Sequence, residues 1–134
     1  MGSDFRRTLG GFVTQHRCRP TRFQRVATWN VEGLSLEKGT KLEEIQRWMR
    51  QYRISIFCIQ ETHCKGSSYF NDNGFLVILS GIEEVKATGR TFARVGFIVA
   101  PWAKGAVEGF MQYDDRLASI RVGTHGGQIT LVSV

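Results

Sequence analysis

The stretch ISIFCI at residues 54–59 is the strongest indication of the fold class of this 134-residue chain. It is short, rich in β-branched residues and almost continuously apolar, which is typical of a strand buried on both faces of a sheet. A second strand candidate, RVATW at residues 25–29, lies upstream. A helical pattern separates the two stretches, so the sequence predicts a βαβ unit whose two strands run parallel as neighbours.

The helix between these strands is predicted from the spacing of its apolar residues. The side chains expected on its buried face recur at the period of 3.6 residues: Leu42, Ile45, Met49 and Tyr52. Lys41 falls on the opposite, polar face. Thr40, followed three residues later by Glu43, matches a capping box, in which the two side chains satisfy backbone N–H groups at the start of a helix.

Beyond residue 70 the pattern changes to strands without long helices. Asn73 and Gly74 form a turn signal, and residues 81–90 form a polar stretch expected to be a loop or hairpin connection. The further strand candidates are residues 75–80, 95–100, 117–122 and 128–134. An α/β opening that leads into antiparallel strands predicts the α/β class, leaning towards α+β.

Composition excludes two classes of protein. Hydrophobic residues make up 42% of the chain and charged residues 22%, which is ordinary for a globular domain and unlike a disordered chain. No apolar run approaches the roughly 18–20 residues that a transmembrane helix needs, so we expect no membrane-spanning segment.

The net charge of +6 is concentrated at the N-terminus, where residues 1–25 hold six arginines and one aspartate. We therefore divide the chain into a basic, irregular arm at residues 1–24 and a folded domain at residues 25–134. A basic arm can bind nucleic acid by releasing counterions from the phosphates. A solvated leader and a mitochondrial presequence are the alternatives for the arm.

The cysteines indicate a compartment. Cys18, Cys58 and Cys64 make an odd number, and no secretory signal precedes them. This predicts free thiols in a reducing, intracellular environment, either the nucleus or the cytoplasm. Their spacing fits no paired-ligand zinc template, so a buried, inert thiol is the expectation for Cys58.

Polar residues follow both strands of the predicted βαβ unit. Asn30 and Glu32 come after the first strand, and Gln60 and Glu61 come after the second. If the strands are parallel neighbours, these side chains converge on the edge where open α/β sheets bind ligands. One or two carboxylates with amide oxygens and water suit Mg²⁺. The alternative is that Asn30 and Glu61 merely close turns.

These residues also carry a family resemblance. TWNVEGL at residues 28–34 and IFCIQETH at residues 56–63 resemble the opening motifs of the endonuclease/exonuclease/phosphatase superfamily, in particular the endonuclease domains of LINE-type non-LTR retrotransposons and craniofacial-development-protein-like sequences. Residues 95–99, 115–120 and 129–134 resemble the next strands in order. The resemblance implies a four-layer α/β/β/α sandwich, of which this chain supplies the N-terminal part, an incomplete domain.

The resemblance also implies roles for individual residues. Glu61 matches the glutamate that binds the catalytic Mg²⁺ or Mn²⁺, and Glu32 matches a second acidic position of that metal site. Asn30 matches a catalytic asparagine near the metal and the scissile phosphate. Arg116 matches a basic position that is either structural or next to the substrate, and Gln60 supports the rim. The implied substrate is nucleic acid, DNA foremost, and no haem or nucleotide cofactor is implied.

The sequence departs from the family in its later motifs. The Asp-x-Asn and Ser-Asp-His motifs are absent, so the chain has no catalytic His/Asp pair, and neither His63 nor His125 matches the catalytic histidine. We therefore expect an N-terminal fragment of a divalent-metal-dependent phosphodiesterase or endonuclease that is inactive alone. The alternatives are a non-catalytic nucleic-acid-binding module that uses the basic arm and a small phosphatase that uses His63 as its base.

Overall fold

The computed structural model describes residues 25–64, 67–80, 94–114 and 116–134. Its elements in chain order are β1 (Val26–Asn30), α1 (Thr40–Tyr52), β2 (Ile56–Gln60), β3 (Ser68–Asp72), β4 (Phe75–Leu79), β5 (Val95–Val99), the 3₁₀ helix η1 (Pro101–Ala106), β6 (Val107–Asp114), β7 (Leu117–Thr124) and β8 (Gly127–Ser133). The basic arm at residues 1–24 and the loop expected at residues 81–90 lie outside the described residues.

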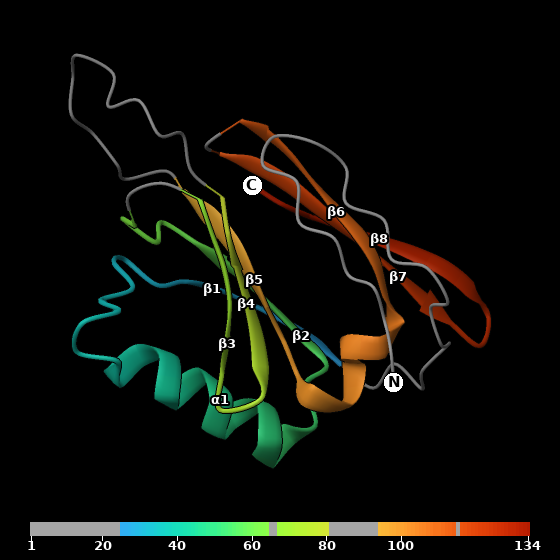
Figure 1. Cartoon of the computed structure of the whole chain (residues 1–134), viewed down its shortest axis with the longest axis horizontal. Coiled ribbons are helices and arrows are strands. Elements are labelled where there is room, and N and C mark those ends of the chain that lie inside the picture. The colour runs from blue at the N-terminus through green and yellow to red at the C-terminus, as the bar shows by residue number, and fades with distance from the viewer. Residues whose placement is uncertain (1–24, 65–66, 81–93, 115) are drawn as a thin grey trace.

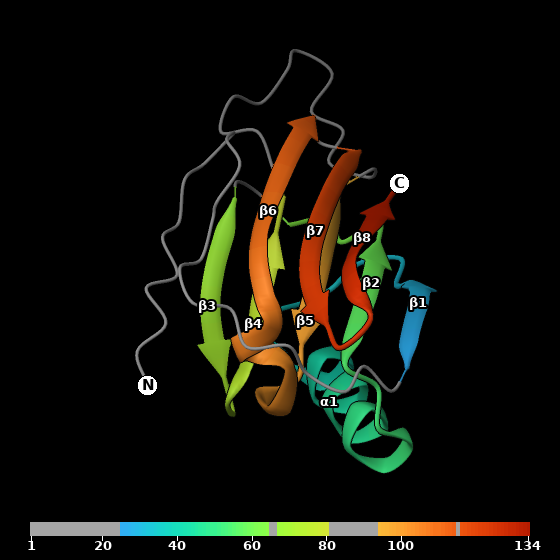
Figure 2. The ribbon, with the colours of Figure 1, turned by 90° about the vertical axis from the view of Figure 1, so that its right-hand side faces the viewer.

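The strands form two sheets. The larger has the order β1-β2-β5-β4-β3 and the smaller the order β6-β7-β8. β1 and β2 pair in parallel, as predicted, and the remaining pairs of the described strands are antiparallel. The two sheets pack face to face, and α1 covers the outer face of the larger sheet (Figures 1 and 2). The α/β sandwich expected from the sequence is therefore confirmed.

The continuous apolar run of β2 is explained by its central position. Ile56 and Cys58 belong to the core between the two sheets, whereas Phe57 and Ile59 belong to the core beneath α1. All four are buried. Because successive side chains of a strand point to opposite faces, a strand that feeds two cores has to be apolar at every position.

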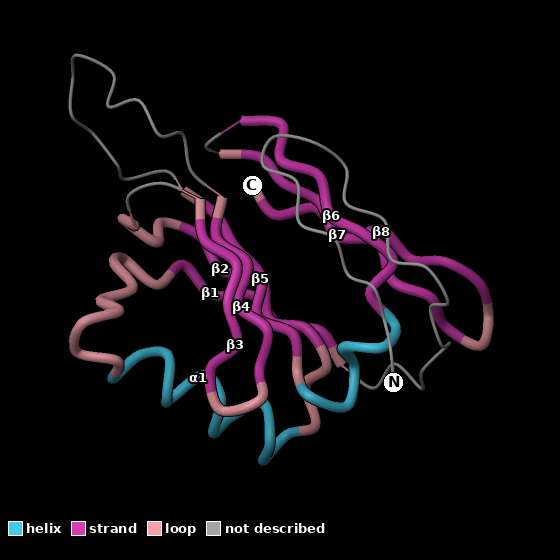
Figure 3. The backbone as a smooth tube through the Cα atoms, viewed as in Figure 1, coloured by secondary structure: helices cyan, strands magenta, loops and turns pink. Residues whose placement is uncertain are grey.

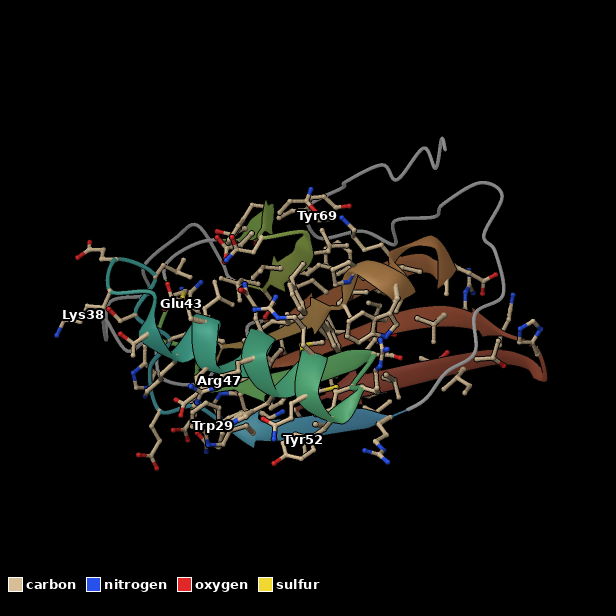
Figure 4. The ribbon with its side chains drawn as sticks, turned by 90° about the horizontal axis from the view of Figure 1, so that it is seen from below. Trp29, Lys38, Glu43, Arg47, Tyr52 and Tyr69 are labelled. Atoms are coloured by element: carbon tan, nitrogen blue, oxygen red, sulfur yellow. The ribbon has the colours of Figure 1, made fainter. Side chains whose placement is uncertain are left out.

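Helix α1 buries the face that was predicted, with one exception. Leu42, Ile45 and Met49 are buried, but Tyr52 is 48% exposed, so the prediction for Tyr52 is wrong. Tyr52 is the last residue of the helix, and the chain turns away at Arg53, whose φ is 54°. Figure 4 shows Tyr52 at the far end of the helix from Lys38.

The capping box is also wrong. Gly39 precedes the helix in a left-handed conformation (φ 67°), and no side chain caps the first turn. The Glu43 N–H instead donates to the Gly39 carbonyl at 3.0 Å, while the Thr40 hydroxyl donates back to Lys38 O at 3.4 Å. A glycine is favoured here because it adopts positive φ without a Cβ clash.

A polar network fastens α1 to the hairpin of β3 and β4. Gln46 is fully buried; its Nε2 donates to Asp72 Oδ2 at 2.6 Å, and its Oε1 accepts from Asn73 Nδ2 at 3.1 Å. Asn73 and Gly74 form the predicted turn, with φ of 52° and 84°. Positive φ at both central residues is typical of the tight turns that join antiparallel strands.

Two strands were not predicted, β3 and β6. Both carry polar residues and are only partly buried: β3 is half-buried with Asn71 exposed, and β6 becomes exposed towards Asp114. Each lies at one edge of its sheet, where few apolar side chains are needed. Figure 3 shows both as strands.

In the parts of the chain that the structure describes, no helix has the length and apolar character needed to cross a membrane.

Candidate metal centre at the carboxyl ends of β1 and β2

The parallel register of β1 and β2 brings the predicted residues to one edge of the larger sheet. Asn30 lies directly opposite Gln60, and Glu61 is the next residue after Gln60. The pairing continues past the strands, because the Val31 N–H donates to the Gln60 carbonyl at 3.0 Å. The convergence expected from the βαβ pattern is therefore present in the backbone.

The two loops that leave these strands are joined to each other. The Gly33 N–H donates to the Glu61 carbonyl at 2.7 Å, and the Leu34 N–H donates to the Thr62 carbonyl at 2.7 Å. The Asn30 side chain closes the first turn, since its Oδ1 accepts from the Glu32 N–H at 3.2 Å. The Asn30 amide also carries two N–H donors on Nδ2.

This edge holds a concentration of left-handed backbone. Non-glycine residues with positive φ occur at Glu32 (47°), Glu61 (53°) and His63 (57°), and Gly33 between them has φ 100°. A Cβ at Gly33 would lie 3.2 Å from His63 Nδ1, so glycine is favoured there both by the positive φ and by the close approach of the His63 ring. Residues in such conformations cost about 1–3 kcal/mol each and cluster at functional sites, which marks these loops as a candidate site.

The side chain of Gln60 holds the edge together. Its Nε2 donates to Thr28 Oγ1 at 3.0 Å and to Ser133 Oγ at 3.1 Å, and Ser133 Oγ donates to the Ile59 carbonyl at 3.3 Å. Gln60 therefore links β1, β2 and the end of β8, which runs beside β2 (Figure 2). Thr28 was quoted within the TWNVEGL motif without a role, and Ser133 was not singled out in the sequence because it lies in no recognisable polar motif.

The carboxylates of the site differ in exposure. Glu61 is half-buried, and Glu32 and Asn30 are exposed. Among the described residues, no hydrogen bond or ion pair engages the Glu61 carboxylate. Carboxylates such as those of Glu61 and Glu32 are of the chemical kind that a hard cation such as Mg²⁺ takes, one or two at a time, with water and phosphate completing its shell. Within the described ranges no group of three His, Cys, Asp or Glu is arranged as a metal cage.

Arg116 occupies the turn between β6 and β7. It is exposed, and its backbone N–H donates to Asp114 Oδ1 at 2.7 Å. The turn lies at the same end of the sandwich as the carboxyl ends of β1 and β2 (Figures 1 and 2). The two histidines among the described residues lie apart: His63 is two residues after Glu61, whereas His125 is exposed in the turn between β7 and β8, at the opposite end of the smaller sheet.

The described cysteines are buried, neutral thiols. Burial raises the pKa of the Cys58 thiol to about 11. Burial also raises the pKa of Cys64, whose Sγ lies 3.5 Å from the Leu34 carbonyl. A thiol is a metal ligand or nucleophile only as the thiolate, so both residues serve in packing. Cys18 lies outside the described residues.

One residue at this edge was misjudged in the sequence. Lys41, assigned to the solvent face of α1, is half-buried and donates from Nζ to the Val31 carbonyl at 2.5 Å. The available signal was its place in the first turn of a helix, where the macrodipole disfavours a cation.

Comparison with known proteins relates the chain to mobile elements. No protein-family model matches it. Over 43 residues it is 40% identical to the Drosophila melanogaster protein described as "Probable RNA-directed DNA polymerase from transposon X-element". The matched stretch is 32% of this chain and 4% of the length of that relative. The chain is thus similar to a transposon protein over about a third of its own length.

Proposed function

We propose that residues 25–134 are the N-terminal part of a divalent-metal-dependent phosphodiesterase domain of the endonuclease/exonuclease/phosphatase type, whose complete form hydrolyses nucleic acid. The observation that carries this proposal is the parallel register that sets Asn30 opposite Gln60, immediately before Glu61. The α/β/β layering, the similarity to a transposon protein and the arginines of residues 1–25 support it.

In this proposal each residue at the edge has a distinct task. Glu61 binds Mg²⁺ or Mn²⁺, with Glu32 as a second carboxylate, and such a cation polarises a phosphoryl oxygen. Asn30 keeps its Oδ1 on the Glu32 N–H and offers Nδ2 as a donor to a phosphate oxygen. Arg116 lies near the path of the substrate, where a guanidinium can contact a phosphate.

The proposed site is a cation site that lacks the His/Asp pair of the family's later motifs. The sequence contains no Asp-x-Asn or Ser-Asp-His motif, and His125 lies at the wrong end of the fold. General acid–base catalysis contributes about 10²–10⁴-fold to such reactions. We therefore propose that this chain binds the cation but hydrolyses nucleic acid poorly by itself.

Titration of the 134-residue chain with Mn²⁺ tests the proposal. We expect one Mn²⁺ to bind and the variant Glu61→Gln to bind it more than 10-fold more weakly, because even residues that only orient a ligand typically change metal affinity about 10–100-fold. Isothermal titration calorimetry and the electron paramagnetic resonance signal of free Mn²⁺ measure this affinity.

Glu37→Gln is the matched control, since it removes the same charge from an exposed glutamate in the loop after β1. It should leave the affinity within about 2-fold of wild type, because exposed charges are screened. Equal affinities for Glu61→Gln and Glu37→Gln would contradict a metal site at Glu61, whatever residual Mn²⁺ binding the chain shows.

A further inference from the structure

Lys41 makes unusual contacts for a lysine in the first turn of a helix. Its Nζ donates to the Val31 carbonyl at 2.5 Å and lies 3.4 Å from the Glu32 carbonyl. The same ammonium is 6.0 Å from the centre of the Trp29 ring. The side chain is half-buried, and its ammonium group reaches from α1 to the segment that follows β1.

The helix itself does not favour this arrangement. Cations are disfavoured near a helix N-terminus, where the free backbone N–H groups carry partial positive charge, and Glu43 is the acidic residue of that first turn. Lys41 is unfavourable for the helix but is held by specific contacts to another segment. This combination indicates a role outside the helix. The contacts identify the segment concerned, residues 30–33, which we call the Asn30 turn.

The Asn30 turn is held from two sides. Its N–H groups point to the β2 side, where Val31 and Gly33 donate to the carbonyls of Gln60 and Glu61. Its carbonyls at Val31 and Glu32 point to Lys41. Positive φ at Glu32 and Gly33 makes the turn a conformation that needs such support.

We propose that Lys41 is a positioning residue that locks the Asn30 turn in the conformation that presents Asn30 and Glu32 to the cation. The inference rests on the proposed function, because it assigns Lys41 to the same metal site. Lys41 acts through the backbone and touches neither the cation nor the substrate.

The direction of the effect separates positioning from simple electrostatics. A positive charge near a cation site repels the cation, so removing that charge alone would strengthen metal binding. Removing a group that holds the Asn30 turn in place would weaken metal binding instead.

Lys38→Met is the matched control, because Lys38 is exposed in the loop between β1 and α1 and projects away from the fold (Figure 4).

The test uses the 134-residue chain with Lys41→Met, Lys41→Arg and Lys38→Met. Amide hydrogen exchange at Gly33 and Leu34 reports the turn without any metal. We expect exchange at least about 10-fold faster in Lys41→Met, since a hydrogen bond from a charged group is among the stronger ones in proteins. Lys41→Arg, which keeps a cationic donor, and Lys38→Met should stay near wild type.

Mn²⁺ titration gives the second reading. We expect Lys41→Met to bind Mn²⁺ at least about 5-fold more weakly and Lys38→Met to bind it equally or more tightly. Unchanged amide exchange at Gly33 and Leu34 in Lys41→Met, or an Mn²⁺ affinity of Lys41→Met equal to or above that of wild type, would overturn the assignment.

If Lys41→Met does not fold, Lys41→Arg decides, because loss of amide protection in Lys41→Arg would contradict the role of a cationic donor. If wild type itself binds no Mn²⁺, the proposed function fails, and the exchange rates alone decide whether Lys41 holds the turn.

Discussion

Replacing Gly96 with alanine is expected to destabilise the folded sandwich severely. Gly96 lies in β5, at the centre of the larger sheet, opposite Ile59 of β2 and Leu79 of β4. A Cβ there would stand 2.6 Å from the Ile78 carbonyl oxygen and 2.8 Å from Leu79 Cδ2. Relief of the first contact requires β4 and β5 to move apart, because its partner is backbone. We expect a loss of about 3 kcal/mol or more in the free energy of unfolding.

Urea unfolding followed by circular dichroism measures this loss, and an insoluble product is the extreme outcome because a whole domain has a margin of only about 5–15 kcal/mol. Gly105→Ala is the matched control: Gly105 lies in η1, and a Cβ there would meet nothing within 4 Å. Its stability should stay within about 0.5 kcal/mol of wild type. A Gly96→Ala chain as stable as the Gly105→Ala chain would show that β5 is not packed as described.

Replacing Ile120 with alanine is expected to remove about 3 kcal/mol of stability. Ile120 lies in the middle of β7 and is fully buried in the core between the two sheets. Truncation leaves a cavity against the larger sheet, and the loss of transfer free energy adds to the cost of that cavity. The prediction tests whether the smaller sheet packs on the larger one in solution.

Ile129→Ala provides the comparison within the same sheet, because Ile129 of β8 is 40% exposed and pairs with Val122 beside the Ile120–Leu131 pair. We expect it to cost about 1 kcal/mol or less, since a smaller part of its surface than that of Ile120 is removed from water. Thermal or urea unfolding of both variants checks the difference. Equal losses for Ile120→Ala and Ile129→Ala would mean that the smaller sheet is not docked.

The sequence predicted the central elements of the fold because their patterns reflect burial alone. The stretch at residues 54–59 was apolar at nearly every position because β2 feeds two cores, and Leu42, Ile45 and Met49 kept the helical period because one face of α1 meets the sheet. Burial on this scale dominates the free energy of folding. Patterns of this kind therefore indicate both the element and its place.

The edges and ends of elements were harder to predict. β3 and β6 were missed because edge strands carry polar side chains, and the capping box at Thr40 was wrong because Gly39 offered the backbone an alternative start to α1. Tyr52 kept the helical period but lies where the helix ends. Local hydrogen bonds and the turn of the chain decide where a helix or strand begins and ends. Alternative ends of the same element differ little in free energy.

The candidate site was predictable in its location but not in its detail. Parallel pairing was enough to place Asn30 beside Gln60 and Glu61, because the carboxyl ends of parallel strands share an edge. The left-handed backbone at Glu32 and Glu61 could not be foreseen, since these residues rarely adopt positive φ. Lys41 was assigned to solvent because helical periodicity describes one helix and not the loop that crosses it.

The proposed function requires that one cation contacts the ends of both β1 and β2. Paramagnetic broadening of the amide nuclear magnetic resonance signals by substoichiometric Mn²⁺, recorded on the 134-residue chain, tests it most directly. We expect residues 30–33 and 60–63 to broaden together in the wild type and neither segment to broaden in Glu61→Gln. Broadening of only one of these segments, or broadening centred on the acidic residues Glu43 and Glu44 of α1, would contradict it.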